Sequence, residues 1–115
     1  MAESASSVDL SVLTDELLMA ASTSASGRAT RVFRAVAGGS LSQLLLVLRD
    51  GKALSDHDNP GEALLQVLRG RVRLTAGETA WELGVNAHIA IPQQRHALLA
   101  LEDSAVLLTV VKPHS

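Results

Sequence analysis

The chain has 115 residues, a formal net charge of −2 and no cysteine. This length suits one domain with its own hydrophobic core, and the absence of cysteine excludes disulfides and thiolate ligands for a metal. The charge lacks the basic excess of a nucleic-acid-binding surface, and no apolar run approaches the roughly 18 residues of a membrane span. Because the first residues also lack the basic region of a signal peptide, we expect a cytoplasmic protein without nucleic-acid or membrane partners.

The first predicted element is an amphipathic helix from Val8 to about Ala21, with Ser7 or Asp9 as its N-cap. Its apolar side chains recur at helical spacing, at Leu10, Leu13, Leu17 and Ala21. A short linker of small polar residues follows the helix. We therefore assign residues 1–28 to the helix with its linker and residues 29–115 to a β domain.

Nine candidate strands follow at short intervals. They are predicted at residues 30–37, 41–49, 53–57, 63–69, 71–76, 79–83, 88–91, 96–101 and 105–111. Turn residues separate them: Asp50-Gly51 suits a tight hairpin, and Asn59-Pro60-Gly61 suits a type II turn. Eight or nine short strands with almost no helix predict an all-β sandwich or barrel.

Two of the predicted strands are apolar at nearly every position. Residues 44–48 and 106–111 contain a single polar residue, Thr109, whereas a strand with one solvent-exposed face alternates apolar and polar residues. Both faces of these strands are therefore expected to be covered. The barrel interior covers one face, and the helix can cover only part of the other. We therefore expect a homodimer, in which a second subunit covers the remaining part of the outer face. The alternative is that the helix and the terminal strands cover these faces without a second subunit.

Two stretches of the chain have a regular spacing of glycine, histidine, proline and turn residues. The first contains, in chain order, Gly51, His57, Asn59, Ala63 and Gly70. The numbers of residues between successive members are five, one, three and six. The second contains Asn86, Pro92 and His96, with five residues between the first two and three between the last two.

These stretches resemble the two sequence motifs of the cupin family, over about residues 40–112. The resemblance implies a double-stranded β-helix, or jelly-roll barrel, in which three histidines and a glutamate often hold a metal. Asn59 and Ala63 stand where the family has its second histidine and its glutamate. Asn86 replaces a glycine, which is plausible because asparagine tolerates a left-handed backbone. His96 lies one position short of its usual distance from the proline.

A metal site would be short of ligands. His57 and His96 supply two, whereas a non-haem iron site needs two histidines and a carboxylate, and a catalytic zinc site needs three protein ligands. Glu62 is the candidate third ligand, but neighbours on a strand point to opposite faces, so it should face outward if Ala63 faces inward. The absence of a cofactor is therefore expected over a bound divalent metal such as Fe, Zn, Mn or Ni. A metalloenzyme of the isomerase or dioxygenase type is the alternative.

Without a metal, His57 and His96 have two other roles. They can be partly buried histidines, hydrogen-bonded to each other, to a backbone carbonyl or to Gln94. Together with Asn59 and Gln94, they can also bind the carboxylate or hydroxyl group of a ligand in an apolar pocket. The leading hypothesis is a metal-free or weakly metal-binding small-molecule-binding module. A further alternative is a structural or interaction protein whose barrel is filled by its own side chains, and the fold does not decide whether the chain is an enzyme.

Three arginines alternate along two successive strands, at Arg69, Arg71 and Arg73. They could form an anion-binding patch. A solvated outer face is the favoured interpretation, because Glu78 and Glu82 on the neighbouring hairpin strand can pair with them.

Overall fold

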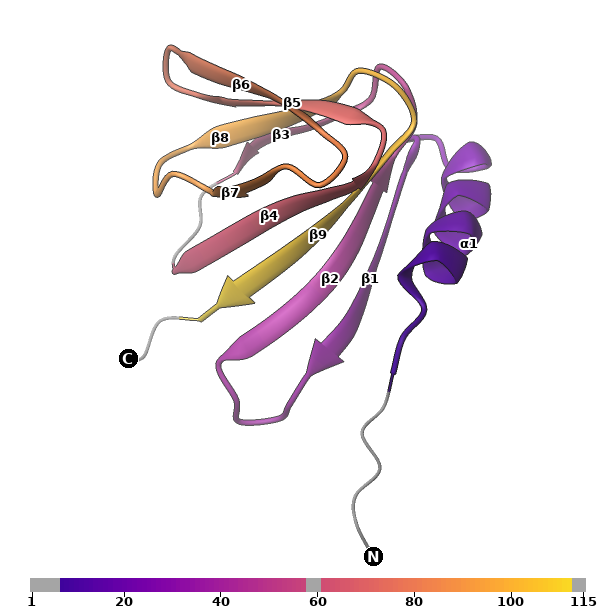
Figure 1. Cartoon of the computed structure of the whole chain (residues 1–115), viewed down its shortest axis with the longest axis vertical. Helices are drawn as coiled ribbons and strands as arrows, with labels where there is room; N and C mark the ends of the chain where they lie inside the picture. The colour runs from indigo at the N-terminus through magenta and orange to yellow at the C-terminus, as the bar shows by residue number, and fades with distance from the viewer. Residues whose placement is uncertain (1–6, 58–60, 113–115) are drawn as a thin grey trace, which may run out of the picture.

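The computed structural model of the chain describes residues 7–57 and 61–112, with Asp56 and His57 described by their backbone alone. Its elements in chain order are α1 (Leu10–Ser22), β1 (Arg28–Ala35), β2 (Leu41–Leu48), β3 (Ala53–His57), β4 (Glu62–Arg69), β5 (Arg71–Ala76), β6 (Thr79–Gly84), β7 (His88–Ala90), β8 (His96–Ala100) and β9 (Ser104–Val111). The predicted all-β fold with one preceding helix is confirmed (Figure 1). In the described residues, no helix is long and apolar enough to cross a membrane.

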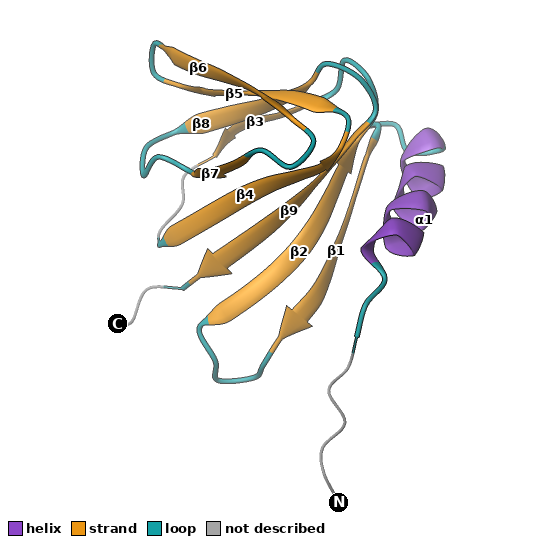
Figure 2. Cartoon of the chain, in the orientation of Figure 1, coloured by secondary structure: helices purple, strands orange, loops and turns teal. Residues whose placement is uncertain are grey.

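The strands form two antiparallel sheets that pack face to face as a jelly-roll barrel (Figure 2). The larger sheet has the order β1-β2-β9-β4-β7, and the smaller sheet has the order β3-β8-β5-β6. Strand β9 follows all the other strands in the sequence but lies between β2 and β4. The apolar strands β2 and β9 are therefore neighbours within the larger sheet.

Helix α1 begins where the sequence provides a cap. The Asp9 side chain accepts hydrogen bonds from the backbone N–H groups of Ser11 and Val12, at 3.0 and 3.1 Å. These bonds satisfy two of the four N–H groups that a helix leaves without partners at its start. The apolar side of the helix covers one end of the outer face of the larger sheet, through a buried cluster of Leu13, Leu17, Ala21, Leu45, Val47 and Ala105. The helix thus covers part of that face, as expected.

The space between the sheets is filled by aliphatic side chains. Leu65 and Val67 of β4 face Val72 and Leu74 of β5, and each of the four is 1% exposed or less. Trp81 packs against the rim of this core. Since the whole chain has one tryptophan and one phenylalanine, the barrel interior depends on close packing of leucine and valine.

Glycines with a left-handed backbone stand where the chain passes from one sheet to the other. Gly51 (φ 81°) lies between β2 and β3, and Gly70 (φ 83°) lies between β4 and β5. The turn at Asp50-Gly51 is present, with the Lys52 N–H donating to the Arg49 carbonyl at 2.9 Å. The predicted hairpin is wrong, because β1 and β9 already occupy both edges of β2 and leave none for β3.

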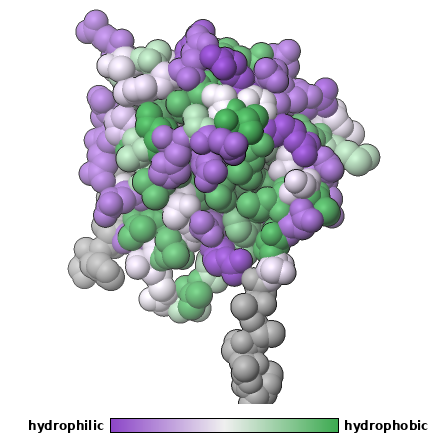
Figure 3. All heavy atoms as spheres, viewed as in Figure 1, coloured by the Kyte–Doolittle hydropathy of each residue, from purple (hydrophilic) through white to green (hydrophobic). Residues whose placement is uncertain are grey.

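The remaining predictions of local structure agree closely with the fold. Asn86 has the expected left-handed conformation, with φ 74°. The observed strand bounds differ from the predicted ones by at most two residues. The type II turn predicted at Asn59-Pro60-Gly61 lies largely outside the described residues. The face seen in Figure 3 carries both hydrophilic and hydrophobic side chains, intermixed over most of its area.

Candidate functional site

Of the histidine side chains that the structure describes, His96 is the buried one, with 8% of its surface exposed. It is the first residue of β8 and lines a cavity of about 30 Å³ inside the barrel. The other lining side chains are all aliphatic: Leu46, Leu54, Leu65, Leu74, Ile91, Leu98 and Leu108. His96 is therefore the single polar side chain among the described residues that line this cavity.

A backbone hydrogen bond orients the His96 ring. The ring Nδ1 lies 3.0 Å from the carbonyl oxygen of Gln94. Because a carbonyl oxygen can only accept, Nδ1 carries the proton in this bond. The contact is made by the Gln94 backbone, whereas Gln94 as a whole is exposed. Of the hydrogen bonds proposed for this histidine, the one to a backbone carbonyl is observed.

The structure brings the backbones of the two predicted site histidines together. His57 is the last residue of β3, and its Cα is paired in register with that of His96 on β8. The smaller sheet thus places residues from both sequence motifs on adjacent strands. Asn59, the third predicted binding residue, lies outside the described residues, so its role stays a prediction.

Strand β4 places Ala63 and Glu62 on opposite faces. Ala63 is 4% exposed and belongs to the barrel core, and Glu62 is exposed. This alternation is what an extended strand requires. The candidate carboxylate ligand therefore points away from the cavity that His96 lines.

No protein-family model matches the sequence, and no curated protein sequence matches it. Solved structures do match. A conserved Streptococcus pyogenes protein of unknown function superimposes with a TM-score of 0.76 and 26% identity, over 99% of this chain and 93% of that one. A cupin superfamily protein from Desulfitobacterium hafniense gives a TM-score of 0.70 and 16% identity, over 75% and 78% of the two chains. An RmlC-like cupin protein from Desulfovibrio desulfuricans gives a TM-score of 0.65 and 20% identity, over 76% of this chain and 84% of that one.

The chain has a small cupin fold. The match to the Streptococcus pyogenes protein covers 99% of this chain, so it includes α1 as well as the barrel. The other two matches cover about three quarters of this chain. The resemblance inferred from the spacing of glycine, histidine and proline is therefore confirmed at the level of the fold.

The described residues do not fit a metal site of the kind that the family resemblance implies. Among the side chains that the structure describes, which do not include those of Asp56 and His57, no group of three or more His, Cys, Asp or Glu residues could hold a metal ion. Ala63 offers no donor atom, and Glu62 lies on the opposite face of β4. Catalytic iron and zinc sites need about three protein ligands.

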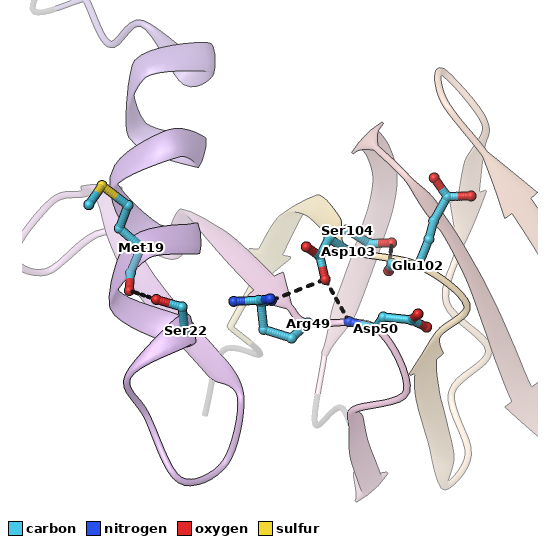
Figure 4. A network of polar contacts seen from close by, with 7 residues as sticks. All are labelled: Met19, Ser22, Arg49, Asp50, Glu102, Asp103 and Ser104. Carbon is cyan, nitrogen blue, oxygen red and sulfur yellow. Dashed lines mark hydrogen bonds and ion pairs between the residues drawn. The ribbon is translucent and has the colours of Figure 1, made fainter.

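A larger cleft lies outside the barrel. It has a volume of about 290 Å³ and lies between the end of α1 and the turns that join the two sheets. Figure 4 shows its polar framework: the Asp103 carboxylate accepts hydrogen bonds from Arg49 Nε at 3.1 Å and from the Asp50 backbone N–H at 2.8 Å. These bonds fasten the β2–β3 turn to the β8–β9 turn. Sequence analysis missed this pair, because 54 residues separate Arg49 from Asp103 and neither belongs to a motif.

Ser104 stabilises the same end of the barrel from inside. It is 1% exposed, and its hydroxyl accepts a hydrogen bond from the Arg71 N–H at 3.0 Å. The hydroxyl also lies within donating distance of the carbonyl oxygens of Glu102 (2.7 Å) and Arg71 (3.0 Å). Ser104 therefore ties the start of β9 to the start of β5, one strand from each sheet.

The arginines on β4 and β5 have acidic partners. Arg73 and Arg71 contact Glu82 at 2.9 and 3.5 Å, and Arg69 contacts Asp15 of α1 at 2.7 Å. The hydrogen bond from Arg73 is the main cause that lowers the pKa of Glu82. Glu82 is confirmed as a partner, and these pairs belong to a solvated surface where ion pairs add little stability.

The Asp103 contacts predict a dependence of stability on pH. The Asp50 N–H, with a smaller contribution from Arg49, lowers the pKa of Asp103 below its ordinary value of 3.8. A carboxyl group whose pKa is lower in the folded state stabilises the fold above its unfolded pKa, and this stabilisation is lost as the pH falls through the folded pKa. In urea denaturation, we expect wild type to lose stability below about pH 4 more steeply than Asp103→Asn.

The matched control for this experiment is Asp50→Asn. The described contacts of Asp50 with Asp103 use its backbone N–H, which the substitution retains. The control should therefore keep the wild-type slope. Equal slopes for wild type and Asp103→Asn would contradict the prediction.

Proposed function

We propose that this cupin is a metal-independent interaction module, in which the barrel is a packed core and the outer surface carries the function. The observation that supports this proposal is the volume of the cavity beside His96, about 30 Å³. Small-molecule sites usually have volumes of about 300–1,000 Å³. A space of about 30 Å³ admits roughly two water molecules.

The packing of the barrel explains the small volume. Leucine side chains from β2, β3, β4, β5, β8 and β9 converge on the space that an open cupin barrel would offer to a ligand. Protein interiors of this kind have a density close to that of organic crystals. A metabolite could enter only if several of these side chains moved apart, and each such rearrangement would reduce the burial that stabilises the core.

The second candidate function is the small-molecule-binding module. The observation that favours it is the buried His96 ring in otherwise aliphatic surroundings. A polar group in such a place is often the one that orients a ligand. In this case His57, Asn59 and Gln94 are the further candidates for contact with the ligand, and only a very small ligand, or one polar end of a larger one, fits beside His96.

The His96→Leu variant distinguishes the two candidates. If the barrel is a packed core, leucine should replace the imidazole among the neighbouring leucines and change the free energy of unfolding by less than about 1.5 kcal/mol. Thermal melting should then show no stabilisation of either protein by short carboxylic acids, alcohols, Fe²⁺, Zn²⁺, Mn²⁺ or Ni²⁺. Elemental analysis of the purified protein should find no stoichiometric metal.

A thermal shift by one of these acids or alcohols in wild type, lost in His96→Leu, would establish the small-molecule-binding module instead. Stoichiometric metal in the purified protein would overturn both candidates. The matched control is Ala97→Leu, which introduces the same side chain next to His96 in β8 on a half-buried position away from the cavity. It should leave any ligand response unchanged.

A further inference from the structure

The cleft at the end of α1 lies where three connections of the chain meet. Its walls come from the linker after α1, the turn between β2 and β3, and the turn between β8 and β9. Its volume is about 290 Å³, compared with about 30 Å³ for the cavity beside His96, and small-molecule sites begin at about 300 Å³. Most of its lining residues are polar or charged. The cleft, unlike the barrel cavity, therefore has the size and the polarity of a small-molecule site.

Two basic side chains line this cleft, those of Arg49 and Lys52. The Arg49 guanidinium uses its Nε to bind Asp103, at 3.1 Å. Among the described residues, its two terminal nitrogens and the Lys52 ammonium group have no hydrogen-bond or ion-pair partner. The cleft thus contains cationic donors that the protein itself does not use.

The chain holds both basic side chains against the walls of the cleft. The Asp103 carboxylate accepts from the Asp50 N–H as well as from Arg49, and the Arg49 backbone N–H donates to the Gly27 carbonyl at 2.9 Å. The aliphatic part of Lys52 lies against Gly27, where a Cβ would come within 2.5 Å of the Lys52 Cγ. A site that is held in place before the ligand arrives loses less entropy on binding.

Acceptor atoms lie beside these donors. Both hydrogen bonds to Asp103 use Oδ1, so Oδ2 can accept from a ligand. The Ser22 hydroxyl donates to the Met19 carbonyl at 2.6 Å and keeps its lone pairs as acceptors. The Asp50 carboxylate, in contrast, is turned away from Arg49 (Figure 4). The cleft therefore suits a ligand that has an anionic group and also hydroxyl groups.

Phosphate is the anionic group that matches two basic side chains. A phosphate monoester has three terminal oxygens and a charge of about −1.5 to −2 at neutral pH, and both guanidinium and ammonium groups bind phosphate well. A carboxylate has two oxygens and a single charge, so it matches one basic group rather than two.

We propose that this cleft binds a small, soluble phosphate monoester with hydroxyl groups, and that Arg49 and Lys52 hold its phosphate. The Ser22 hydroxyl and the Asp103 carboxylate accept hydrogen bonds from the ligand's hydroxyl groups. This inference rests on the proposed function, which places binding on the outer surface, and it names the site on that surface and the class of ligand.

Nuclear magnetic resonance titration of the whole chain tests the site, with glycerol phosphate as the probe at constant ionic strength. Glycerol phosphate should cause saturable shifts of the backbone amide signals of the cleft, including those of Gly27 and Lys52. Glycerol and acetate should cause none. Lys52→Met removes the charge and keeps an aliphatic side chain against Gly27. It should raise the dissociation constant for glycerol phosphate by roughly tenfold or more.

The matched control is Lys112→Met, which removes the same charge from the other lysine of the chain. Lys112 is exposed and follows the last residue of β9, whereas Asp103 precedes the first residue of that strand. The control should keep the wild-type dissociation constant. Circular dichroism checks that both variants are folded.

The absence of saturable shifts in the cleft, or equal dissociation constants for wild type and Lys52→Met, would overturn the inference. Equal binding of acetate would overturn the assignment to phosphate. If no signal shifts at all, the packed barrel still stands. Saturable shifts confined to the barrel lining, at His96 and Leu74, would contradict the proposed function as well, so the two failures are distinguishable.

Discussion

Gly70→Ala should destabilise the fold by at least about 3 kcal/mol, and in urea denaturation it should have the largest effect of any single methyl group added to a turn. The backbone at Gly70 is left-handed, with φ 83°. A Cβ at this position would also overlap the Asp103 carbonyl oxygen and the Ser104 hydroxyl. Neither atom can move aside easily, because one belongs to the backbone and the other is buried, accepts a hydrogen bond from the Arg71 N–H and lies within donating distance of two backbone carbonyls.

Gly51→Ala is the matched control for this prediction. Gly51 has nearly the same backbone conformation, with φ 81°, but a Cβ there would have no neighbour within 4 Å. The control should lower the free energy of unfolding only by the cost of holding an alanine in the left-handed conformation, about 1–2 kcal/mol. If both variants lose the same stability, the overlap at Gly70 does not contribute and the explanation given for Gly70 is wrong.

Leu74→Ala should lower the free energy of unfolding by about 2–5 kcal/mol. Leu74 is fully buried and lines the cavity beside His96, so the substitution removes apolar contacts and widens the cavity. A larger apolar cavity can admit a small apolar molecule such as benzene. In thermal melting, we therefore expect benzene to stabilise Leu74→Ala but not wild type.

The matched control is Val85→Ala, which removes methyl groups from an exposed side chain. It should change stability by less than about 0.5 kcal/mol and should create no response to benzene. An equal response to benzene in wild type would show that the barrel is already open, which contradicts the packed core.

The sequence predicts most of the architecture because it contains local signals for it. Asp9 caps the helix, Gly51 and Gly70 allow the sharp passages between sheets, and Asn86 adopts the left-handed turn. Each of these residues acts through its own backbone or its immediate neighbours, so pattern and composition are sufficient to find them.

The hairpin at Asp50-Gly51 shows where such signals are insufficient. A turn sequence determines that the chain reverses but not which strand receives it, and β2 has both edges occupied by strands from distant parts of the chain. The sequence could not predict the bond between Arg49 and Asp103 for the same reason. It depends on bringing together two turns that are 54 residues apart.

The candidate site was predicted in part. The structure pairs the backbones of His57 and His96 on neighbouring strands, and Glu62 is exposed, as the alternation along a strand predicts. The size of the cavity could not be predicted, because it depends on how leucines from six strands fill the space together. Close packing of this kind is a property of the assembled core and not of any single strand.

The position of β9 determines the order in which the larger sheet can form. Strands β2 and β4 are both made before β9, but they reach each other only through it. Until residues 104–111 are available, one edge of β2 and one edge of β4 have no strand beside them. Pairs such as Leu44 with Leu108 must also close a long loop. Such distant pairings form slowly, and unpaired apolar edges can associate with other chains in the meantime. The yield of folded protein should therefore depend on how quickly β9 inserts between its two neighbours.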